Sequence, residues 1–457
     1  MGINHRLAAM LVVCVAFLYG AYVTKPLMDQ ETEDHRLRQE RDGEGLMQRL
    51  SKIFDPQYQD TYMAEQRRKY RESIGLKDDG VTIDSTIKAH KHQEATPETS
   101  GDAETHSSSP EKATSELAEK KIYRVVHTTV GHEGHNSRVR RSIGVPEVRN
   151  FSPFLMLDHF SIAPEAGFPD HPHRGQETIT YVLQGALDHE DFTGSRGTLR
   201  RGDLQFMTAG RGVVHAEMPH AATPDEQAAA AEAPDDYTPM GGPGDVEGLQ
   251  LWVDLPVDLK QCEPRYRDLR AAEIPTTSVL GDARGSSSVK VISGEAYGVS
   301  SLQDLAYTPV WMLDYVVEPP GNDDAPIVVE QRIPAGFNSF VYIISGANVT
   351  IADRTVGSHT NVFFTANPTD PEVVRITVGS SPKTGSGTDD ALLAPAKSTR
   401  FLIVAGQILD QPVVQHGPFV EISRERIIKA FNDYQTFSNG FERAWGWASH
   451  IGRRLMV

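Results

Sequence analysis

Two short histidine motifs constrain this chain more than any other feature. His171 and His173 lie in the run Gly167-Phe-Pro-Asp-His-Pro-His-Arg-Gly175, and a second motif downstream contains His215 and Glu217. Residues at positions i and i+2 of an extended strand point to the same face. Two such strands can direct three imidazoles and one carboxylate at one cation. The spacing therefore predicts a metal site formed by these four residues.

The residues around the motifs predict short strands joined by tight turns. Thr178-Ile-Thr-Tyr-Val-Leu183 has the length and composition of a strand. Pro172 has no amide hydrogen, so the first motif should lie at the start or edge of a strand, where a ligand has room to approach. Glycines at positions 167, 175, 185, 202, 210 and 212 suit barrel corners and positive φ. We expect this region to form a β-barrel.

Strand-like segments begin at about residue 121 and continue through most of the chain. Tyr123–Val130 is expected to begin the first barrel, and Phe154–Leu157 and Leu249–Leu255 to add strands to it. A second series is predicted at Val289–Ile292, Trp311–Val317, Phe340–Ile344, Asn348–Ile351 and Phe401–Val404. The predicted fold is all-β, with two barrels in tandem. The second series lacks both histidine motifs, so we expect the second barrel to bind no metal.

The end of the chain predicts a helix. Ser423 can cap it, and Asn439-Gly440 is suited to its C-terminal stop. The apolar stripe of this helix would consist of Ile427, Ile428, Phe431 and Tyr434. We interpret His416, Trp445 and Trp447 as packing or structural residues.

The first 120 residues differ in composition from the rest. Residues 7–23 form an apolar run that reaches the lower end of the about 17–25 residues needed to span a bilayer. A membrane anchor, a cleaved secretory signal and an organelle-targeting segment all fit this run, and the lack of a small-x-small cleavage site favours an anchor, as an apolar helix within residues 1–25. Residues 26–120 predict a charged, low-complexity and mostly disordered linker. The protein is then expected to be membrane-anchored by its N-terminus, in the secretory pathway or mitochondrion.

Charge and cysteine content exclude some classes of protein. The formal net charge of −17 argues against direct binding of nucleic acid, which rewards basic patches. The two cysteines, Cys14 and Cys262, provide no disulfide framework. We expect a monomer without direct nucleic-acid contacts.

Further runs of residues follow a pattern known from one family. These runs are Arg138–Gly144, Gly167–Gly175, His189–Phe192, Gly202–Gly212, His215–Pro219, Gly248–Val253, Val291–Ala296, Gln415–Phe419 and Asn439–Arg443. Together they resemble the pirin family of the cupin superfamily, from about Lys121 to the C-terminus. The resemblance implies two jelly-roll (cupin) barrels: an N-terminal domain at residues 121–256 with the metal site, and a C-terminal domain at residues 257–457 without metal, ending in the helix.

Two segments depart from the compact form of this family. Ala221–Val246 is rich in Ala, Pro, Glu and Gly, and the segment from Gly379 to Ser398 is rich in Gly, Ser, Thr and Asp. We interpret both as insertions, the first of them a disordered surface insertion that leaves the predicted metal site intact.

The resemblance implies the same four ligands as the spacing does. In the family, the residues that match His171, His173, His215 and Glu217 bind a metal, usually iron. Three nitrogens and one oxygen also suit manganese, nickel and copper, and an octahedral ion keeps positions open for substrate or oxygen. Zinc would tend to close a four-ligand site. We expect Fe(II), with Mn, Ni, Cu or Zn as alternatives.

Residues next to the ligands have more than one interpretation. Glu177 lies where many cupins have a further ligand, but the matching residue of pirins does not bind, so a structural role is favoured. His189 and Glu190 are candidates for orienting a ligand from outside the coordination sphere. Arg174 either does the same or pairs with a carboxylate.

Three functional hypotheses follow. Pirins are similar to quercetin 2,3-dioxygenases, in which a flavonol binds the metal, oxygen adds across the ring and carbon monoxide leaves. Here a small phenolic substrate would bind, and Glu217 would be the catalytic base that takes its hydroxyl proton. Alternatively, the protein is a redox-sensing iron protein that regulates a protein partner such as a transcription factor, without catalysis. A β-sheet scaffold with an incidental metal is the third. We predict the dioxygenase.

Overall fold

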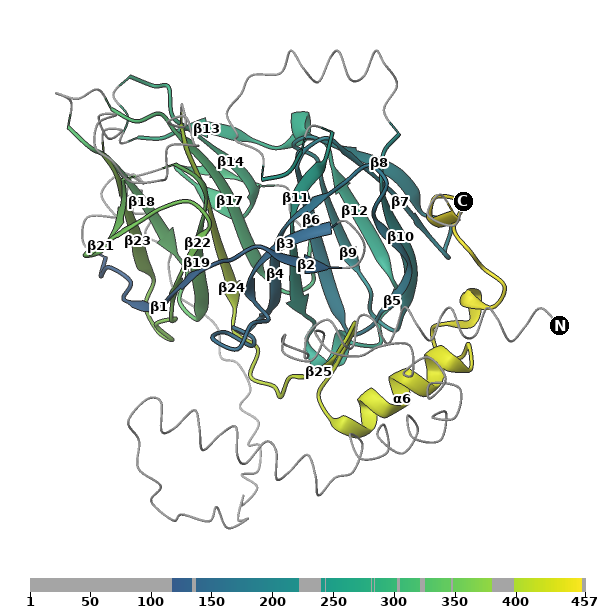
Figure 1. Cartoon of the computed structure of the whole chain (residues 1–457). Coiled ribbons are helices and arrows are strands. Elements are labelled where there is room, and N and C mark those ends of the chain that lie inside the picture. The colour runs from purple at the N-terminus through teal and green to yellow at the C-terminus, as the bar shows by residue number, and fades with distance from the viewer. Residues whose placement is uncertain are drawn as a thin grey trace, which may run out of the picture. The chain divides into compact units, whose positions relative to one another are not determined.

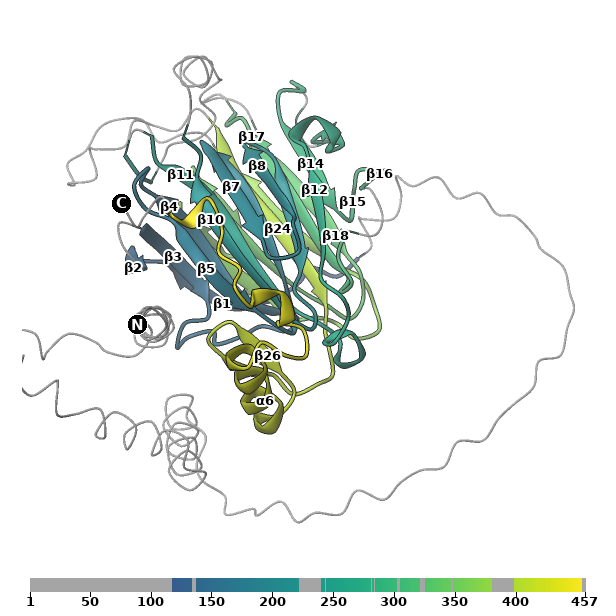
Figure 2. The same ribbon diagram turned by 90° about the vertical axis from the view of Figure 1, so that its right-hand side faces the viewer.

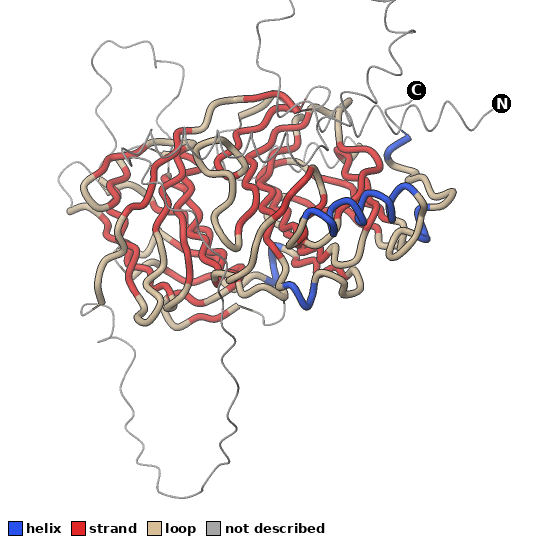
Figure 3. Tube along the Cα trace, turned by 90° about the horizontal axis from the view of Figure 1, so that it is seen from below, coloured by secondary structure: helices blue, strands red, loops and turns tan. Residues whose placement is uncertain are grey.

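In the computed structural model, the regular elements of the described residues are mostly strands, with a single α-helix near the C-terminus (Figure 3). Among the described residues, no helix is both long enough and apolar enough to cross a membrane. The predicted apolar helix, nearly all of the predicted linker, and most of the two predicted insertions lie outside the described residues. The structure describes residues 117–453, except 134–136, 222–239, 243, 281, 283, 302–304, 321–324, 347 and 380–397.

The N-terminal half contains two antiparallel sheets (Figure 1). The larger has seven strands, in the order β12 (Arg265–Leu269), β9 (Leu204–Thr208), β6 (Gln176–Gln184), β11 (Val246–Asp254), β4 (Phe154–Ile162), β3 (Ser137–Ile143) and β2 (Gly131–Glu133). The smaller has four strands, in the order β5 (Phe168–His173), β10 (Val213–Pro219), β7 (Ala186–Asp191) and β8 (Arg196–Arg200).

The C-terminal half repeats this arrangement. Its larger sheet has seven strands, in the order β1 (Ile122–His127), β22 (Thr360–Phe364), β19 (Phe337–Ser345), β24 (Thr399–Gln407), β17 (Val310–Val317), β14 (Ser288–Ser293) and β13 (Thr276–Ser278). Its smaller sheet has four, in the order β18 (Ile327–Ile333), β23 (Glu372–Val378), β20 (Val349–Ile351) and β21 (Arg354–Val356). Short pairs are formed by β15 (Glu295–Ala296) with β16 (Val299–Ser300) and by β25 (Val414–His416) with β26 (Phe419–Glu421). The 3-10 turns are η2 (Val257–Leu259), η3 (Ala271–Glu273) and η4 (Glu442–Ala444).

Three apolar layers hold these sheets together. One fills the C-terminal barrel between its two sheets and includes Leu313 and Val374. Another lies between the two large sheets and joins the halves back to back, for example through Leu251 and Phe340. A third occupies one end of the N-terminal barrel, around Phe160. The rest of the N-terminal barrel interior carries polar side chains, and the histidine motifs lie there. The expectation of no metal in the C-terminal barrel stays a prediction.

The prediction that Tyr123–Val130 begins the first barrel is wrong. β1 pairs with β22 of the C-terminal half, with Val125 opposite Val362. Conversely, β12 pairs with β9 of the N-terminal half, although it follows that half in the sequence. The alternation of apolar residues identifies a strand but not its distant partner. Pairing therefore crosses the predicted division between residues 256 and 257, which itself stays a prediction.

The predicted C-terminal helix is confirmed as α6 (Arg424–Gln435). Ser423 is its N-cap, and the Ser423 side chain accepts a hydrogen bond from the amide of Arg426. Ile427 and Ala430 are buried, whereas Ile428, predicted to lie in the apolar stripe, is 46% exposed.

The predicted end of this helix, at Asn439-Gly440, is wrong. The helix ends at Gln435, and Phe437 follows with a φ of 52°. A residue in this left-handed conformation ends a helix because the next amide can no longer continue the i to i−4 hydrogen bonds of the helix. Among the aromatic residues beyond it, Trp447 packs against Phe192 as predicted. Trp445 meets the Phe437 ring edge-on at 5.2 Å, although it is 77% exposed.

One histidine between the halves makes stability depend on pH. Burial lowers the pKa of His359 to about 4, from 6.5, and Arg140 adds to the effect. Between these values the unfolded chain binds more protons than the folded one, so stability falls as the pH decreases through this range, by about 2 kcal/mol. His359→Asn should remove this part of the pH dependence, because asparagine tolerates the φ of 61° at this position. Urea unfolding of the wild type and of His359→Asn, each at about pH 7 and about pH 4.5, tests this. An equal loss of stability on acidification in the two proteins would contradict it.

Candidate metal centre

The two histidine motifs lie on neighbouring strands of the four-stranded sheet. β5 carries His171 and His173, and β10 carries His215 and Glu217. The strands pair antiparallel, with His171 directly opposite His215. Opposed residues in such a pair have Cβ atoms about 4.5–5.5 Å apart. This register brings two imidazoles together, and His173 adds a third from the same face of β5.

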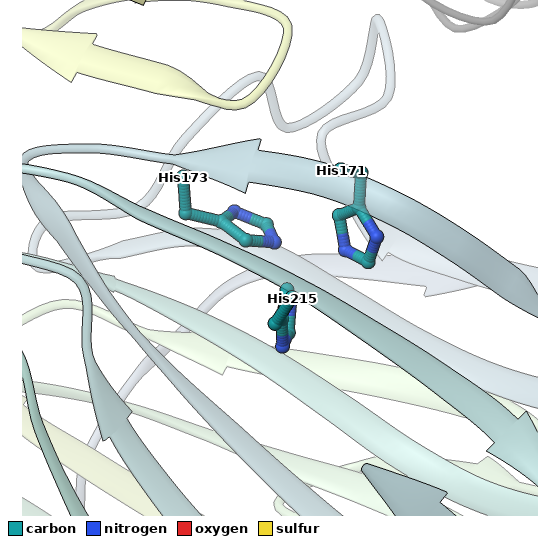
Figure 4. Close-up of side chains that lie close together, drawn as sticks. All are labelled: His171, His173 and His215. Carbon is teal, nitrogen blue, oxygen red and sulfur yellow. The ribbon is translucent and has the colours of Figure 1, made fainter. Parts of the chain in front are cut away.

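The three imidazoles converge in the interior of the N-terminal barrel (Figure 4). The ring centroids of His171 and His215 are 4.3 Å apart, and His173 lies 5.0 Å from each of them. One nitrogen from each ring lies within 4.8 Å of the others. His173 and His215 are buried, whereas His171 is only partly buried. The side of the cluster nearest to solvent is therefore that of His171.

Hydrogen bonds orient two of the rings and leave the third without a partner. Nδ1 of His171 lies 2.8 Å from the carbonyl oxygen of Pro169, so Nδ1 donates and Nε2 carries the lone pair. Nδ1 of His173 lies 2.8 Å from the side-chain amide of Gln176. Neither nitrogen of His215 has a hydrogen-bond partner among the described residues, although His215 is only 2% exposed. Because a buried unsatisfied polar group costs about 1–3 kcal/mol, His215 fits a metal ligand better than a structural histidine.

The electrostatic environment keeps these rings neutral. Burial lowers the pKa of His171, although the nearby Glu217 opposes the change. Burial, and then the neighbouring histidines, hold the pKa of His173 and of His215 well below the usual value. Metal ions bind neutral imidazole, so at neutral pH the cluster is in its ligating form.

Glu217 lies beside the three-histidine cluster rather than within it. One carboxylate oxygen accepts a hydrogen bond from the hydroxyl of Thr180 at 3.3 Å, and the other accepts one from the amide of Gln250 at 3.1 Å. The register of β10 against β5 shifts between His215 and Glu217. His215 is opposite His171 and Glu217 is opposite Phe168, so the extra residue lies on β5, whereas β10 pairs regularly with β7. The structure thus brings together three of the four predicted ligands and holds the fourth against the facing sheet.

Three residues of this facing sheet were missed by the sequence reasoning. Thr180 lies on β6, and Gln250 and Trp252 lie on β11. Trp252 donates from Nε1 to the Gln250 oxygen at 3.0 Å, and its ring meets the His173 ring edge-on at 5.1 Å. The sequence did contain a sign of these residues. Gln250 and Trp252 occupy every second position of β11, so they point to one face of the strand, as residues facing a polar barrel interior do.

Two family models match this chain. The model described as Pirin covers residues 136–253, and the model described as Pirin C-terminal cupin domain covers residues 324–440. A pirin-like protein of Solanum lycopersicum is 40% identical over 70% of this chain and 92% of its own length. The chain belongs to the pirin family. Pirin of Homo sapiens is 39% identical over 73% of this chain and 98% of its own length. The resemblance read from the motifs is confirmed.

Solved structures support a cupin-like fold for this pirin. A quercetin 2,3-dioxygenase from Acinetobacter baumannii matches with a TM-score of 0.54 and 26% identity, over 70% of this chain and 98% of that chain. GK1651 from Geobacillus kaustophilus matches with a TM-score of 0.50 and 29% identity, over 65% of this chain and 100% of that chain. Both agree with the mostly β architecture.

Glu177 has the structural role predicted for it. Its carboxylate accepts hydrogen bonds from the hydroxyl of Thr208 at 2.7 Å and from the amides of Tyr307 and Thr308 at 3.0 and 3.1 Å. These bonds tie β6 to the segment that enters the C-terminal barrel.

The residues predicted to orient ligands have other contacts. Arg174 forms an ion pair with Asp433 of α6 at 2.7 Å, which agrees with the alternative that it pairs with a carboxylate. His189 lies 3.0 Å from the Gln205 amide. Glu190 accepts hydrogen bonds from amides of the C-terminal segment, so the structure does not show it orienting a ligand by direct contact. The physical reason is strand alternation, which places Glu190 on the opposite face of β7 from His189. His416 lies edge-on to an aromatic ring of α6, as a structural residue would.

Proposed function

We propose that this pirin is an Fe(II)-dependent dioxygenase of the quercetin 2,3-dioxygenase type. The convergence of three neutral imidazoles, two of them buried and one without a hydrogen-bond partner among the described residues, carries the proposal. A quercetin 2,3-dioxygenase among the similar structures supports the reaction type. Mn, Ni, Cu and Zn remain alternative ions for the same donor set.

The residues present fit an iron ion. His171, His173 and His215 would hold it, and Glu217 would complete the set by turning from the facing sheet towards the cluster. A bound Fe(II) would supply open positions for a substrate oxygen and the redox capacity for dioxygen chemistry. The nitrogen-rich donor set agrees with this choice.

The other residues would act on a phenolic substrate. Glu217 is placed to accept the proton of a substrate hydroxyl as a general base. While Glu217 lies against the facing sheet, Thr180 and Gln250 bond its two oxygens, and they would set the direction from which the proton is taken when Glu217 acts as base rather than as ligand. The ring of Trp252, next to His173, would form an apolar wall for a flat aromatic substrate such as a flavonol.

The proposal is tested by metal analysis of the purified chain, followed by oxygen uptake and carbon monoxide release with quercetin. Glu217→Ala should lower iron occupancy and abolish oxygen uptake while the protein stays folded by circular dichroism, because a ligand is lost from a preformed cavity. Glu263→Ala is a control, since the Glu263 side chain is 79% exposed and outside the barrel interior.

The outcomes separate the hypotheses. Iron content and oxygen uptake that are unchanged by Glu217→Ala would contradict the role given to Glu217. Iron binding without oxygen uptake would favour the redox-sensing regulator of a protein partner. A wild-type chain that binds none of these ions would refute both functions.

A further inference from the structure

The C-terminal strap, residues Trp447–Gly452, crosses the outer face of the four-stranded sheet. In Figure 2 this yellow segment runs over β10 and β5 towards the end marked C. At its start, the Trp447 ring meets Phe192 edge-on at 6.4 Å. Further along, Ser449 and Gly452 are buried. The strap is therefore packed against the sheet that carries the histidines.

Two carboxylates of this sheet hold the backbone of the strap. Asp170 accepts a hydrogen bond from the amide of Ser449 at 3.1 Å. Glu190 accepts bonds from the amides of His450 at 2.8 Å and Ile451 at 3.3 Å. Asp170 lies on β5 and Glu190 on β7, which are the two neighbours of β10. The strap thus links the strands on both sides of the one that carries His215.

These bonds lie on the outer face of the sheet, opposite the three-histidine cluster. Asp170 precedes His171, and Pro169, on its other side, accepts the bond from Nδ1 of His171. On β7, Glu190 is opposite Ala216, the residue between His215 and Glu217. Side chains alternate between the faces of a strand. The strap therefore bonds to Asp170 and Glu190 on the outer face of the sheet. The residues next to Asp170 and next to Ala216 face inward, towards the three-histidine cluster.

β5 needs such support more than an interior strand does. It is the edge of its sheet, in the order β5-β10-β7-β8. Pro169 and Pro172 have no amide to donate to β10, and β5 carries one extra residue between Phe168 and His171, where its register against β10 shifts. Beyond the other end of β5, Arg174 bonds to Asp433 and to the carbonyl of Asn439. Residues near the C-terminus therefore bond both to Asp170, within β5, and to Arg174, directly after it.

We propose that the C-terminal strap positions the three-histidine cluster by fixing β5 and β7 relative to β10. The role is positioning and not catalytic, and its effect on metal binding rests on the proposed metal site. Loss of residues 449–457 should leave the barrels folded, because none of the described residues in this stretch belongs to an apolar cluster of the barrels, but it should loosen the strands that carry the ligands.

The test uses the full chain, a variant that lacks residues 449–457, and Glu190→Ala. Amide hydrogen exchange of the metal-free proteins should rise about tenfold in residues 168–173 and 213–219 in both variants, because local opening becomes easier. Cobalt(II) affinity should fall about 10–100-fold, the range for lost outer-sphere support of a metal site. Glu190→Gln, which keeps an acceptor oxygen, should restore most of both values.

Asp282→Ala is the matched control, because Asp282 also accepts the amides of a turn, those of Arg284 and Ser287, but in the C-terminal half. It should change neither value. Unchanged exchange in the two strand segments would overturn the proposal, as would raised exchange with unchanged cobalt affinity. A wild-type chain that binds no cobalt would count against the metal-dependent function, and the strap would then be judged by exchange alone.

Discussion

His215→Leu is expected to abolish metal binding while making the metal-free protein more stable. His215 is 2% exposed, and in the part of the chain that the structure describes neither ring nitrogen has a hydrogen-bond partner. Leucine has a similar size and no buried polar atoms in its side chain. The free energy of unfolding of the metal-free protein should therefore rise by about 1 kcal/mol. Metal affinity should fall by more than the roughly 10–100-fold that loss of an outer-sphere partner costs. Cobalt titration and urea unfolding measure the two effects.

His159→Leu is the control with the opposite sign. His159 is also fully buried, but its Nδ1 lies 3.0 Å from the hydroxyl of Tyr342 across the two halves. Its replacement removes a made hydrogen bond, so stability should fall by about 1–3 kcal/mol while cobalt affinity is unchanged. A loss of stability in His215→Leu, similar to that in His159→Leu, would mean that His215 is a structural residue.

The histidine cluster could be predicted because it depends on local geometry. His-x-His and His-x-Glu, on strands bounded by glycines, were enough to predict that His171, His173 and His215 meet. The same reasoning placed Glu217 as a fourth equivalent ligand, and the structure places it beside the cluster. The i, i+2 rule places His215 and Glu217 on one face of β10, but it does not fix the rotamer of Glu217, whose carboxylate bonds to Thr180 and Gln250 of the facing sheet.

What could not be predicted depends on contacts between residues distant in sequence. Nothing local to β1 shows that it pairs with β22 in the other half of the chain. Likewise, Glu190 is adjacent to His189 and is of a residue type that can orient a metal ligand, but its hydrogen-bond partners are amides near the C-terminus. Sequence periodicity identifies which face of a strand is buried, and it does not identify what covers that face.

Lys260→Met is expected to be among the most destabilising single substitutions in the described part of the chain. Lys260 is fully buried, and its ammonium donates to Asp254 at 2.6 Å, to the carbonyl of Gly175 at 2.9 Å and to that of Val420 at 3.2 Å. These bonds join the turn after the first histidine motif, the end of β11, and β26. Removing one partner leaves a buried carboxylate uncompensated, which costs about 3–5 kcal/mol.

The double variant Lys260→Met/Asp254→Asn separates the lost ion pair from lost packing. Asparagine removes the uncompensated charge and keeps an oxygen for the Gln411 amide, which lies 2.7 Å from Asp254. The double variant should therefore be more stable than Lys260→Met alone, with a coupling energy of about 1–3 kcal/mol in urea unfolding. Arg211→Met, which breaks exposed pairs with Glu263 and Glu442, should cost less than about 1 kcal/mol. If Lys260→Met cost no more than Arg211→Met, the buried ammonium would not be holding these three segments together.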